Sequence, residues 1–309
     1  MFAETNHLPL KFAAIDIGSN AIRILFYNVF DDAKEPVFKK ISLTRLPVRL
    51  GEDVFTTGRI SEKKTQKLIR SMAGFRALMD VYEVEGYRAY ATSAMREAEN
   101  GLEVIQKVFF ETGIAINIID GKTEADVIFS NKITENTDPK KSYLYIDVGG
   151  GSTEITLFSK NKKIMSSSFN IGTVRALSGK VSDEDWKKMK SFLKEIKEKT
   201  ADELIGIGSG GNINRLFKLA ALKEGKPLSV KKLKDMYQNL LSMSYYDRTH
   251  ILGLNTDRAD VIIPACEIYL FISKVCEIKQ IQVPKIGLSD GIIKELYAEH
   301  KRKAAGLDV

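Results

Sequence analysis

The sequence contains one unusual arrangement twice: an aspartate ends a short apolar strand, and a glycine-containing turn leads into a second strand. The first copy is Asp16-Ile17-Gly18-Ser19-Asn20, and the second is Asp147-Val148-Gly149-Gly150-Gly151-Ser152-Thr153-Glu154. Each copy opens a similar series of short β-rich runs and longer helical patterns. We therefore expect two duplicated α/β domains with a cleft between them, and ligands in such sheets favour crevices at strand ends.

The first half alternates strand-like and helix-like segments. Apolar residues recur at helical spacing through residues 62–82, whereas short β-rich runs bounded by turn residues indicate strands. Gly113 is the expected end of one helix, because glycine tolerates the left-handed conformation that terminates helices. The predicted strands are 11–17, 21–30, 36–43, 87–91 and 114–119, and the predicted helices are 62–82, 97–112 and one from about Glu124.

The second half restarts this pattern. Ser182 is the expected cap of an amphipathic helix, and Pro264 is expected to kink a later one. The predicted strands are 143–148, 154–158, 163–169, 204–207 and 281–287, and further helices are expected after residues 206–212 and at 231–243, 257–277 and 289–303. This pattern predicts a first domain over residues 1–127 and a second over 128–291, with a final helix at about 292–309 that packs back on the first.

Both aspartate turns are suited to phosphate binding. Glycines let successive backbone N–H groups point into one concavity, and Ser and Thr hydroxyls add donors. A strand-end carboxylate beside such a turn, here Asp16 or Asp147, can hold Mg²⁺ on the phosphate side. The candidate phosphate ligands of these turns are Gly18, Ser19, Asn20, Gly149, Gly150, Gly151, Ser152 and Thr153.

Residues 206–212 form a third glycine-rich turn, Gly206-Ile207-Gly208-Ser209-Gly210-Gly211-Asn212, between a strand and a helix. It matches the G-x-G-x-x-G pattern of dinucleotide-binding enzymes, with Glu224 as a candidate ribose-binding acid. That interpretation leaves both aspartate turns unexplained. We favour a third phosphate loop on the same cleft, with Ser209, Gly210 and Gly211 as its candidate ligands.

The rare residues exclude several kinds of active site. The three histidines, at positions 7, 250 and 300, are scattered, so a multi-His metal site or Ser-His-Asp catalysis is not expected. Cys266 and Cys276 lie ten residues apart in one predicted helix, about 15 Å along its axis, which is too far for a disulfide. Both are expected to be buried core thiols.

The net charge of +7 is uneven, because residues 1–127 carry −1 and residues 128–309 carry +8. A basic half could attract a polyanion such as nucleic acid, a nucleotide or polyphosphate; the alternative is a lysine-rich, solvated face of amphipathic helices. No motif indicates specific nucleic-acid binding. No stretch approaches the roughly 18 apolar residues of a membrane span, and the N-terminus is unlike a signal peptide. We expect a cytoplasmic protein without a membrane partner.

Seven segments carry a resemblance to a known family, and they run along nearly the whole chain. They are Asp16–Asn20, Arg49–Gly51, Ala91–Ala98, Gly121–Ala125, Asp147–Glu154, Gly208–Gly211 and Arg258–Asp260. With them the sequence resembles the exopolyphosphatase/guanosine pentaphosphate phosphatase (Ppx/GppA) family, within the actin/Hsp70/sugar-kinase superfamily of ribonuclease H-like domains. Residues 91–98 are the specific segment, because other members of the superfamily lack it.

The resemblance implies a phosphoanhydride hydrolase that removes the terminal phosphate of inorganic polyphosphate. Glu124 would be the general base, and Asp147 and Glu154 would lie on the Mg²⁺ side with Asp16 nearby. Mg²⁺ is the expected cofactor, and a monovalent cation is a second candidate.

Two arginines are further candidates for phosphate binding. Arg96 lies in the specific segment, and Arg49 begins another matching one. An arginine can bind phosphate oxygens bidentately, but either residue could instead form a surface or interdomain salt bridge.

The sequence departs from the family pattern in three places. Thr123-Glu124-Ala125 replaces Glu-Glu-Ala, so the base loses a neighbouring charge. Gly287-Leu288-Ser289-Asp290-Gly291 replaces Gly-Leu-Arg-Glu-Gly, which bears on activity and substrate choice. The C-terminal helical module of long family members, which helps build a polyphosphate channel, is expected to be absent.

Several functions stay open at this point. Guanosine pentaphosphate (pppGpp) is the alternative substrate, and an ATP-dependent small-molecule kinase is a second class. A non-catalytic sensor of a guanosine alarmone or polyphosphate is a third, which the Ser289-Asp290 departure keeps open. A homodimer is a candidate assembly, because a short chain could complete an extended groove across an interface.

Overall fold

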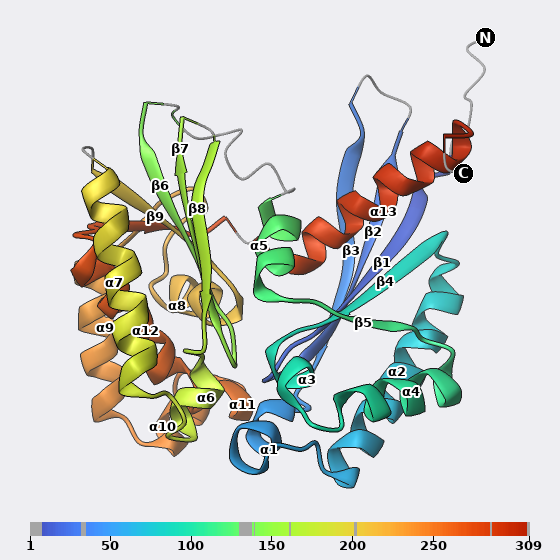
Figure 1. The fold of residues 1–309 in the computed structure, drawn as a ribbon, viewed down its shortest axis with the longest axis horizontal. Coiled ribbons are helices and arrows are strands. Elements are labelled where there is room, and N and C mark those ends of the chain that lie inside the picture. The colour runs from blue at the N-terminus through green and yellow to red at the C-terminus, as the bar shows by residue number, and fades with distance from the viewer. Residues whose placement is uncertain are drawn as a thin grey trace.

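The computed structural model describes residues 8–31, 35–129, 138, 140–160, 162–200, 203–284 and 286–307. Two mixed β-sheets stand side by side, and helices cover the outer side of each (Figure 1). None of the helices in the described ranges combines the length and the apolar composition needed to span a bilayer.

The two sheets share one strand order. The first sheet has the order β3-β2-β1-β4-β5, and in the second, β8-β7-β6-β9-β11 repeats it, with β10 added at the edge. The predicted duplicated α/β fold is therefore confirmed. The strands are β1 (Leu10–Ile17), β2 (Ile22–Phe30), β3 (Val37–Leu46), β4 (Gly86–Ala91), β5 (Ile116–Ile118), β6 (Ser142–Val148), β7 (Thr153–Ser159), β8 (Lys162–Phe169), β9 (Leu204–Ser209), β10 (Leu228–Ser229) and β11 (Gln280–Gln282).

The helices begin and end at recognisable signals. Ser61 and Ser182 accept hydrogen bonds from backbone N–H groups as caps, and Gly113 ends its helix with φ of 66°. The helices are α1 (Leu50–Thr57), α2 (Glu62–Tyr82), α3 (Ser93–Glu97), α4 (Gly101–Thr112), α5 (Gly121–Phe129), α6 (Thr173–Leu177), α7 (Asp183–Lys199), α8 (Gly211–Leu219), α9 (Val230–Ser242), α10 (Tyr245–His250), α11 (Thr256–Ala259), α12 (Ile262–Val275) and α13 (Leu288–Ala304).

Two predicted helices begin differently in the structure. Residues 257–277 divide into α11 and α12 with a break at 260–261, and Pro264 is the third residue of α12. The kink predicted at Pro264 is a full break, because a proline removes the N–H that would bond to the carbonyl four residues earlier, whereas in the first turn of a new helix that N–H has no intrahelical acceptor. The helix predicted over residues 97–112 is α4, which begins at Gly101 after a turn at 98–100, and residue 97 instead ends the short helix α3. This turn brings the Met95 carbonyl so close to Gly101 that a Cβ there would lie 2.3 Å from the carbonyl oxygen.

Other predicted boundaries differ in smaller ways. The strand expected at 281–287 is the short β11, and residue 285 lies outside the described residues. The helices α1, α6 and α10 were not predicted, because each is eight residues or shorter and shows too little periodicity. Cys266 and Cys276 are free and buried, as expected, and burial raises the pKa of each thiol to about 12.

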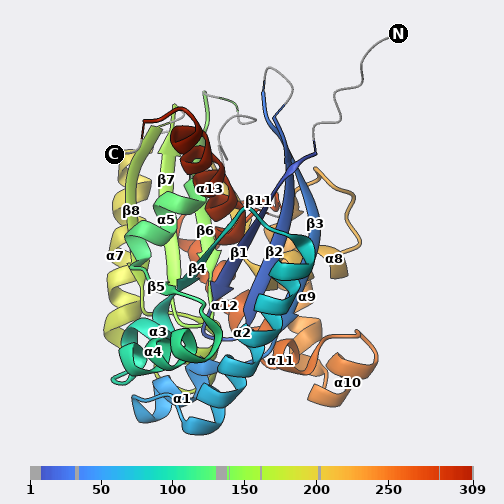
Figure 2. The ribbon, with the colours of Figure 1, turned by 90° about the vertical axis from the view of Figure 1, so that its right-hand side faces the viewer.

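One apolar cluster joins the two sheets. It combines side chains of β1 and β2 with others of β6 and β9, and α5 and α13 complete it. Helix α13 follows the second domain in the chain but packs on β1, β2 and β4 of the first (Figure 1), where Arg88 of β4 forms ion pairs with Glu295 and Glu299. Figure 2 shows α2 and α4 together against the first sheet, away from this junction. The domain boundaries themselves stay a prediction.

Candidate active site

A cavity of about 90 Å³ lies between the domains, where the three glycine-rich turns meet. The sequence assigned these turns to one cleft, and the structure brings most of their residues to its wall. The predicted site residues that line the cavity are Asp16, Gly18, Ser19, Asn20, Glu124, Asp147, Gly149, Gly150, Ser152, Ser209, Gly210 and Gly211.

The two aspartates occupy equivalent positions in equivalent hairpins. In β1–β2, Asp16 lies opposite Arg23, and in β6–β7, Asp147 lies opposite Glu154. The first aspartate is therefore paired with a cation, at 2.6 Å between Asp16 Oδ2 and Arg23 Nη1. The second faces another acid, so the duplicated hairpin concentrates negative charge on the second-domain side of the cavity.

Burial and mutual repulsion perturb the acids on that side. Burial raises the pKa of Asp147 to about 6, although a hydrogen bond from the Ser209 hydroxyl opposes the shift. Burial and the Asp147 charge raise the pKa of Glu154, which accepts a hydrogen bond from the Ser168 hydroxyl at 2.8 Å. Burial and the charges of Glu154, Asp147 and Asp16 hold the pKa of Glu124 well above its ordinary value. Such perturbed carboxyl groups gathered at a cavity are typical of catalytic sites.

Glu124 stands in the first turn of α5, which faces the cavity from the junction of the domains. Asp120 caps this helix, since its carboxylate accepts the Thr123 N–H at 2.7 Å. The Oε2 atom of Glu124 is buried and has no hydrogen-bond partner among the described residues. A glutamate that served only the helix dipole would be solvated, so this orphaned oxygen favours a role in the cavity.

Two glycines are required by the contacts around the cavity. A Cβ on Gly150 would lie 3.0 Å from both the Asn20 backbone nitrogen and the Ser19 Cβ, so the first and second turns meet there without side chains between them. Gly210 has φ of 95°, and a Cβ on it would lie 2.9 Å from Asp147 Oδ1. These positions let backbone N–H groups approach a ligand closely.

Five predicted site residues do not line the cavity. Gly151 packs against the first domain, and the Thr153 hydroxyl donates to the Ile171 carbonyl. Glu154 is buried opposite Asp147 on the neighbouring strand. Arg96 donates a hydrogen bond to the Ile119 carbonyl at 2.7 Å. Its positive charge opposes part of the rise in the pKa of Glu124.

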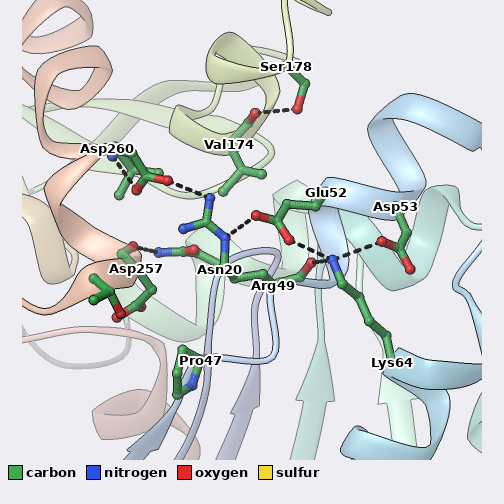
Figure 3. Close-up of polar contacts among 12 residues, drawn as sticks. Asn20, Pro47, Arg49, Glu52, Asp53, Lys64, Val174, Ser178, Asp257 and Asp260 are labelled. Atoms are coloured by element: carbon green, nitrogen blue, oxygen red, sulfur yellow. Dashed lines mark hydrogen bonds and ion pairs between the residues drawn. The ribbon is translucent and has the colours of Figure 1, made fainter. Parts of the chain in front are cut away.

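Arg49 takes the other role that the sequence left open for it. Its guanidinium contacts Asp260 of the second domain at 2.8 Å and Glu52 at 2.5 Å, as Figure 3 shows. The neighbouring Asn20 amide donates to the Asp257 carbonyl at 2.9 Å. Arg49 is thus an interdomain ion-pair partner in this structure rather than part of the cavity wall.

The sequence did not identify several residues that line the cavity. Burial and the charges of Arg45 and Arg23 lower the pKa of Arg258 to about 10, so this wall is locally rich in positive charge. Arg23 could have been found from the antiparallel register of the first hairpin, which places it opposite Asp16. Asn212 ends the third glycine turn, and Thr92, Ser93 and Arg258 lie in segments that match the family, but no role in the site was predicted for any of them. Arg45 and Thr173 are distant from the glycine turns in sequence. The missed residues are Arg23, Arg45, Thr92, Ser93, Thr173, Asn212 and Arg258.

The site fits a magnesium ion that is shared with a substrate. Within the described ranges, no group of three or more His, Cys, Asp or Glu side chains is arranged to hold a metal alone. Mg²⁺ commonly binds through one or two carboxylates together with waters and substrate phosphates. Asp147 and Asp16 line the cavity together with Glu124, whose Oε2 atom is buried without a partner among the described residues, and a nearby cation would stabilise the charged form of this carboxyl group.

A second cavity, of about 400 Å³, adjoins the first and shares Asp16, Arg23, Arg45 and Arg258 with it. Its other walls include apolar side chains of β2 and β3 and the segment 286–290. Within that segment Asp290 accepts hydrogen bonds from the Tyr27 hydroxyl at 2.5 Å and from the Gly287 N–H at 2.8 Å. The unusual Ser289-Asp290 pair therefore lies beside the shared arginines.

Two domains of one topology, joined at glycine-rich turns and a group of buried carboxylates, define an enzyme of the actin-like ATPase fold. Solved structures agree: the Ppx/GppA family member of Aquifex aeolicus superposes with a TM-score of 0.71 at 25% identity, over 94% of this chain and 98% of that one. The sequence matches the Ppx/GppA phosphatase family over residues 29–300, and the chain belongs to this family.

Two curated relatives illustrate the range of the family. A bifunctional 3-dehydroquinate synthase/phosphatase of Fusobacterium nucleatum is 33% identical over 273 residues, which are 81% of this chain but only 41% of that protein. Exopolyphosphatase 1 of Mycobacterium tuberculosis is 22% identical over 303 residues, which are 92% of this chain and 87% of that protein. Family membership places the chain among hydrolases that act on phosphoanhydride bonds.

Proposed function

We propose that the protein removes the terminal phosphate of inorganic polyphosphate by activating a water molecule with Glu124. The observation that carries this proposal is the buried Glu124 Oε2 atom, which has no partner among the described residues and belongs to a cavity-lining side chain. Its surroundings raise its pKa, and a carboxylate with a higher pKa is a stronger base toward water near neutral pH.

The three turns would hold the terminal phosphoryl group. In the described chain, the N–H groups of Gly150 and Ser152 have no backbone acceptor, and the Ser209 hydroxyl lies at the same wall. Arg258 and Arg23 would contact phosphate oxygens from the opposite side. Backbone and guanidinium donors fixed in this way stabilise charge that develops during phosphoryl transfer.

In the proposed reaction, Glu124 takes a proton from water as the water oxygen bonds to the terminal phosphorus. The bond from that phosphorus to the bridging oxygen breaks, and the bridging oxygen leaves with the electron pair on the shortened chain. Mg²⁺, held by Asp147 with Asp16 nearby, would supply positive charge to the phosphate oxygens. A positioned base contributes roughly 10²–10⁴-fold to such a rate.

The test compares inorganic phosphate release with Mg²⁺ from long polyphosphate, tripolyphosphate, pppGpp and ATP. Glu124→Gln should bind the substrate and lose at least about 10²-fold in turnover, whereas Glu111→Gln, an exposed acid of α4, should act like the wild type. Unchanged turnover in Glu124→Gln would refute the assignment. Binding without phosphate release from any of the four substrates would favour a sensor. Formation of ADP from ATP only when an acceptor is present, without release of inorganic phosphate, would favour a kinase.

The second cavity supports pppGpp as the alternative substrate. Leu25, Ile41 and Leu43 give it an apolar wall, and Arg258 stands between it and the smaller cavity. A purine nucleoside prefers such a wall, whereas the phosphate groups of a polyphosphate do not. The same four-substrate assay separates the two candidates, because a nucleoside contribution would lower the KM for pppGpp below that for tripolyphosphate. A cytoplasmic location and a homodimer belong to the proposal as well.

A further inference from the structure

Helix α6 belongs to the second domain, yet two of its side chains lie in the first. Val174 is fully buried in the apolar cluster of the first domain. The guanidinium of Arg175 crosses the same border: Nη2 donates to Glu97 Oε1 at 2.5 Å, and its central carbon lies 4.0 Å from the centre of the Phe55 ring. Arg175 is only 7% exposed, so these partners replace most of its contact with water.

Helix α6 also donates hydrogen bonds to the carbonyl groups of the second glycine turn. Arg175 Nε donates to the Gly151 carbonyl at 2.8 Å, and the N–H groups of Arg175 and Val174 donate to the Gly150 carbonyl at 3.1 and 2.8 Å. The Thr173 N–H donates to the Gly149 carbonyl at 3.0 Å. The carbonyls of Gly149, Gly150 and Gly151 therefore all point toward α6.

The orientation of these carbonyls also fixes that of the neighbouring N–H groups, because the peptide bond is planar. In a trans peptide the carbonyl and the following N–H point in opposite directions. Carbonyls of residues 149–151 that face α6 thus turn the N–H groups of residues 150–152 away from it, and these N–H groups have no backbone acceptor in the described part of the chain. Contacts made by α6 therefore determine where the donors of the second turn point.

The turn also touches the first domain without any intervening space. A Cβ on Gly151 would lie 2.3 Å from Ser93 Oγ, 2.5 Å from Phe55 Cζ and 2.8 Å from Ser19 Oγ. A Cβ on Gly172, which precedes α6, would lie 2.4 Å from the Gly151 carbonyl carbon. Movement of the first domain relative to α6 would therefore disturb the turn directly.

We propose that Arg175 is a positioning residue that couples closure of the two domains to the orientation of the phosphate-binding N–H groups in the second turn. When the domains are together, Glu97 and Phe55 fix the guanidinium, and its Nε fixes the Gly151 carbonyl. When they separate, Arg175 loses both first-domain partners, and that carbonyl is free to rotate. The inference rests on the proposed function, because it assumes that the turn binds phosphate.

The experiment measures binding of tripolyphosphate with Mg²⁺ by calorimetry, in a Glu124→Gln background that prevents turnover. Arg175→Gln should raise the Kd at least about tenfold, since it removes charge-assisted hydrogen bonds. Arg175→Lys should restore only part of the affinity, because one ammonium cannot reproduce the fork that reaches both Gly151 and Glu97. Glu97→Gln should raise the Kd by a smaller factor, and in the Arg175→Gln background it should have no further effect.

The matched control is an exposed ion pair within the first domain, to which Glu97 also belongs. Arg59 and Glu99 lie 3.3 Å apart with side chains 56% and 66% exposed, and Arg59→Gln and Glu99→Gln should leave the Kd unchanged. An unchanged Kd in Arg175→Gln overturns the inference, even if its melting temperature falls, and so do additive effects of Arg175→Gln and Glu97→Gln. If Arg175→Gln does not fold, the Kd of Glu97→Gln decides, and an unchanged value overturns the inference. If the parent protein fails to bind tripolyphosphate, the proposed function falls and the inference falls with it.

Discussion

Replacing Asp147 with asparagine is expected to stabilise the folded protein above pH 6 while it abolishes activity. The carboxylate is held at a cavity wall beside Glu124 and Glu154, and burial raises its pKa from 3.8 to about 6. The folded state therefore binds the Asp147 proton more tightly than the unfolded state does. A group of this kind costs nothing below its unfolded pKa of 3.8; its cost to stability grows as the pH rises from there to about 6 and is constant at higher pH.

The magnitude follows from the shift. A pKa of about 6 instead of 3.8 is a difference of about two pH units, and one pH unit corresponds to 1.36 kcal/mol, so the charged Asp147 costs about 3 kcal/mol of folding free energy. The amide oxygen that Asp147→Asn introduces can still accept the Ser209 hydroxyl, but Arg23 loses a nearby anion. These losses reduce the expected gain to about 2 kcal/mol at pH 8.

The assay is urea unfolding in EDTA at several pH values from 5 to 8, followed by circular dichroism. The free energy of unfolding of Asp147→Asn minus that of the wild type should grow with pH and level off above pH 6 to 7. Asp235→Asn, an exposed acid of α9, should give a flat difference and serves as the control. Mg²⁺ should narrow the gap, because it stabilises the wild-type carboxylate by binding the folded state.

A difference that stays constant from pH 5 to pH 8 would refute this reasoning, since no titrating charge would then separate the two proteins. An Asp147→Asn variant less stable than the wild type at pH 8 would show that the lost interactions of the carboxylate outweigh the relief of its burial. In either case the charged Asp147 would not be a net cost to the folded state.

Four further substitutions test three separate sets of contacts at and around the cavity. Arg258→Gln should raise the KM for tripolyphosphate at least about tenfold, with a smaller change in kcat, because it removes a buried cation beside the cavity; equal KM values would exclude phosphate contact. Gly210→Ala should lower kcat at least about tenfold, since its Cβ would press on Asp147 at a φ that alanine avoids, and normal turnover would show that the turn adapts. Arg49→Gln and Asp260→Asn should each lower the melting temperature, and the double variant should lower it no further than either single variant does. A Kd for tripolyphosphate that rises only in Arg49→Gln would instead assign that arginine to phosphate binding.

The sequence was informative where local pattern decides the structure. The β1–β2 and β6–β7 hairpins, the long helix α2 and the capping Ser182 follow from alternation, periodicity and short-range hydrogen bonds. The two aspartate turns were assigned to one cleft because a repeated strand-end motif places both copies at equivalent edges. The third glycine turn was added because a dinucleotide site would have left both aspartate turns unexplained. The turns do meet at one cavity, although the roles of their residues remain predictions.

What could not be predicted depends on contacts between distant segments. Arg45 and Arg258 reach the cavity from β3 and α11. Arg45 stands in no distinguishing local pattern, and Arg258, although it opens a segment that matches the family, carries no local signal that places it at the cavity. The position of Arg49 depends on where Asp260 lies, about 200 residues later in the chain. Helical periodicity continues through residues 257–277 and does not reveal that Pro264 starts a new helix, α12, instead of bending a single one.

The return of α13 to the first sheet has a consequence for biosynthesis. Phe12, Leu25 and Tyr27 lie on the face of β1 and β2 that is covered jointly by this helix, by α5 and by the second sheet. On the ribosome, strands β1 and β2 emerge long before residues 288–304, so this face lacks both α13 and the second sheet while the second domain is being made. The face is thus fully buried only after translation has passed the second domain, and until then it is an exposed apolar surface of the nascent chain.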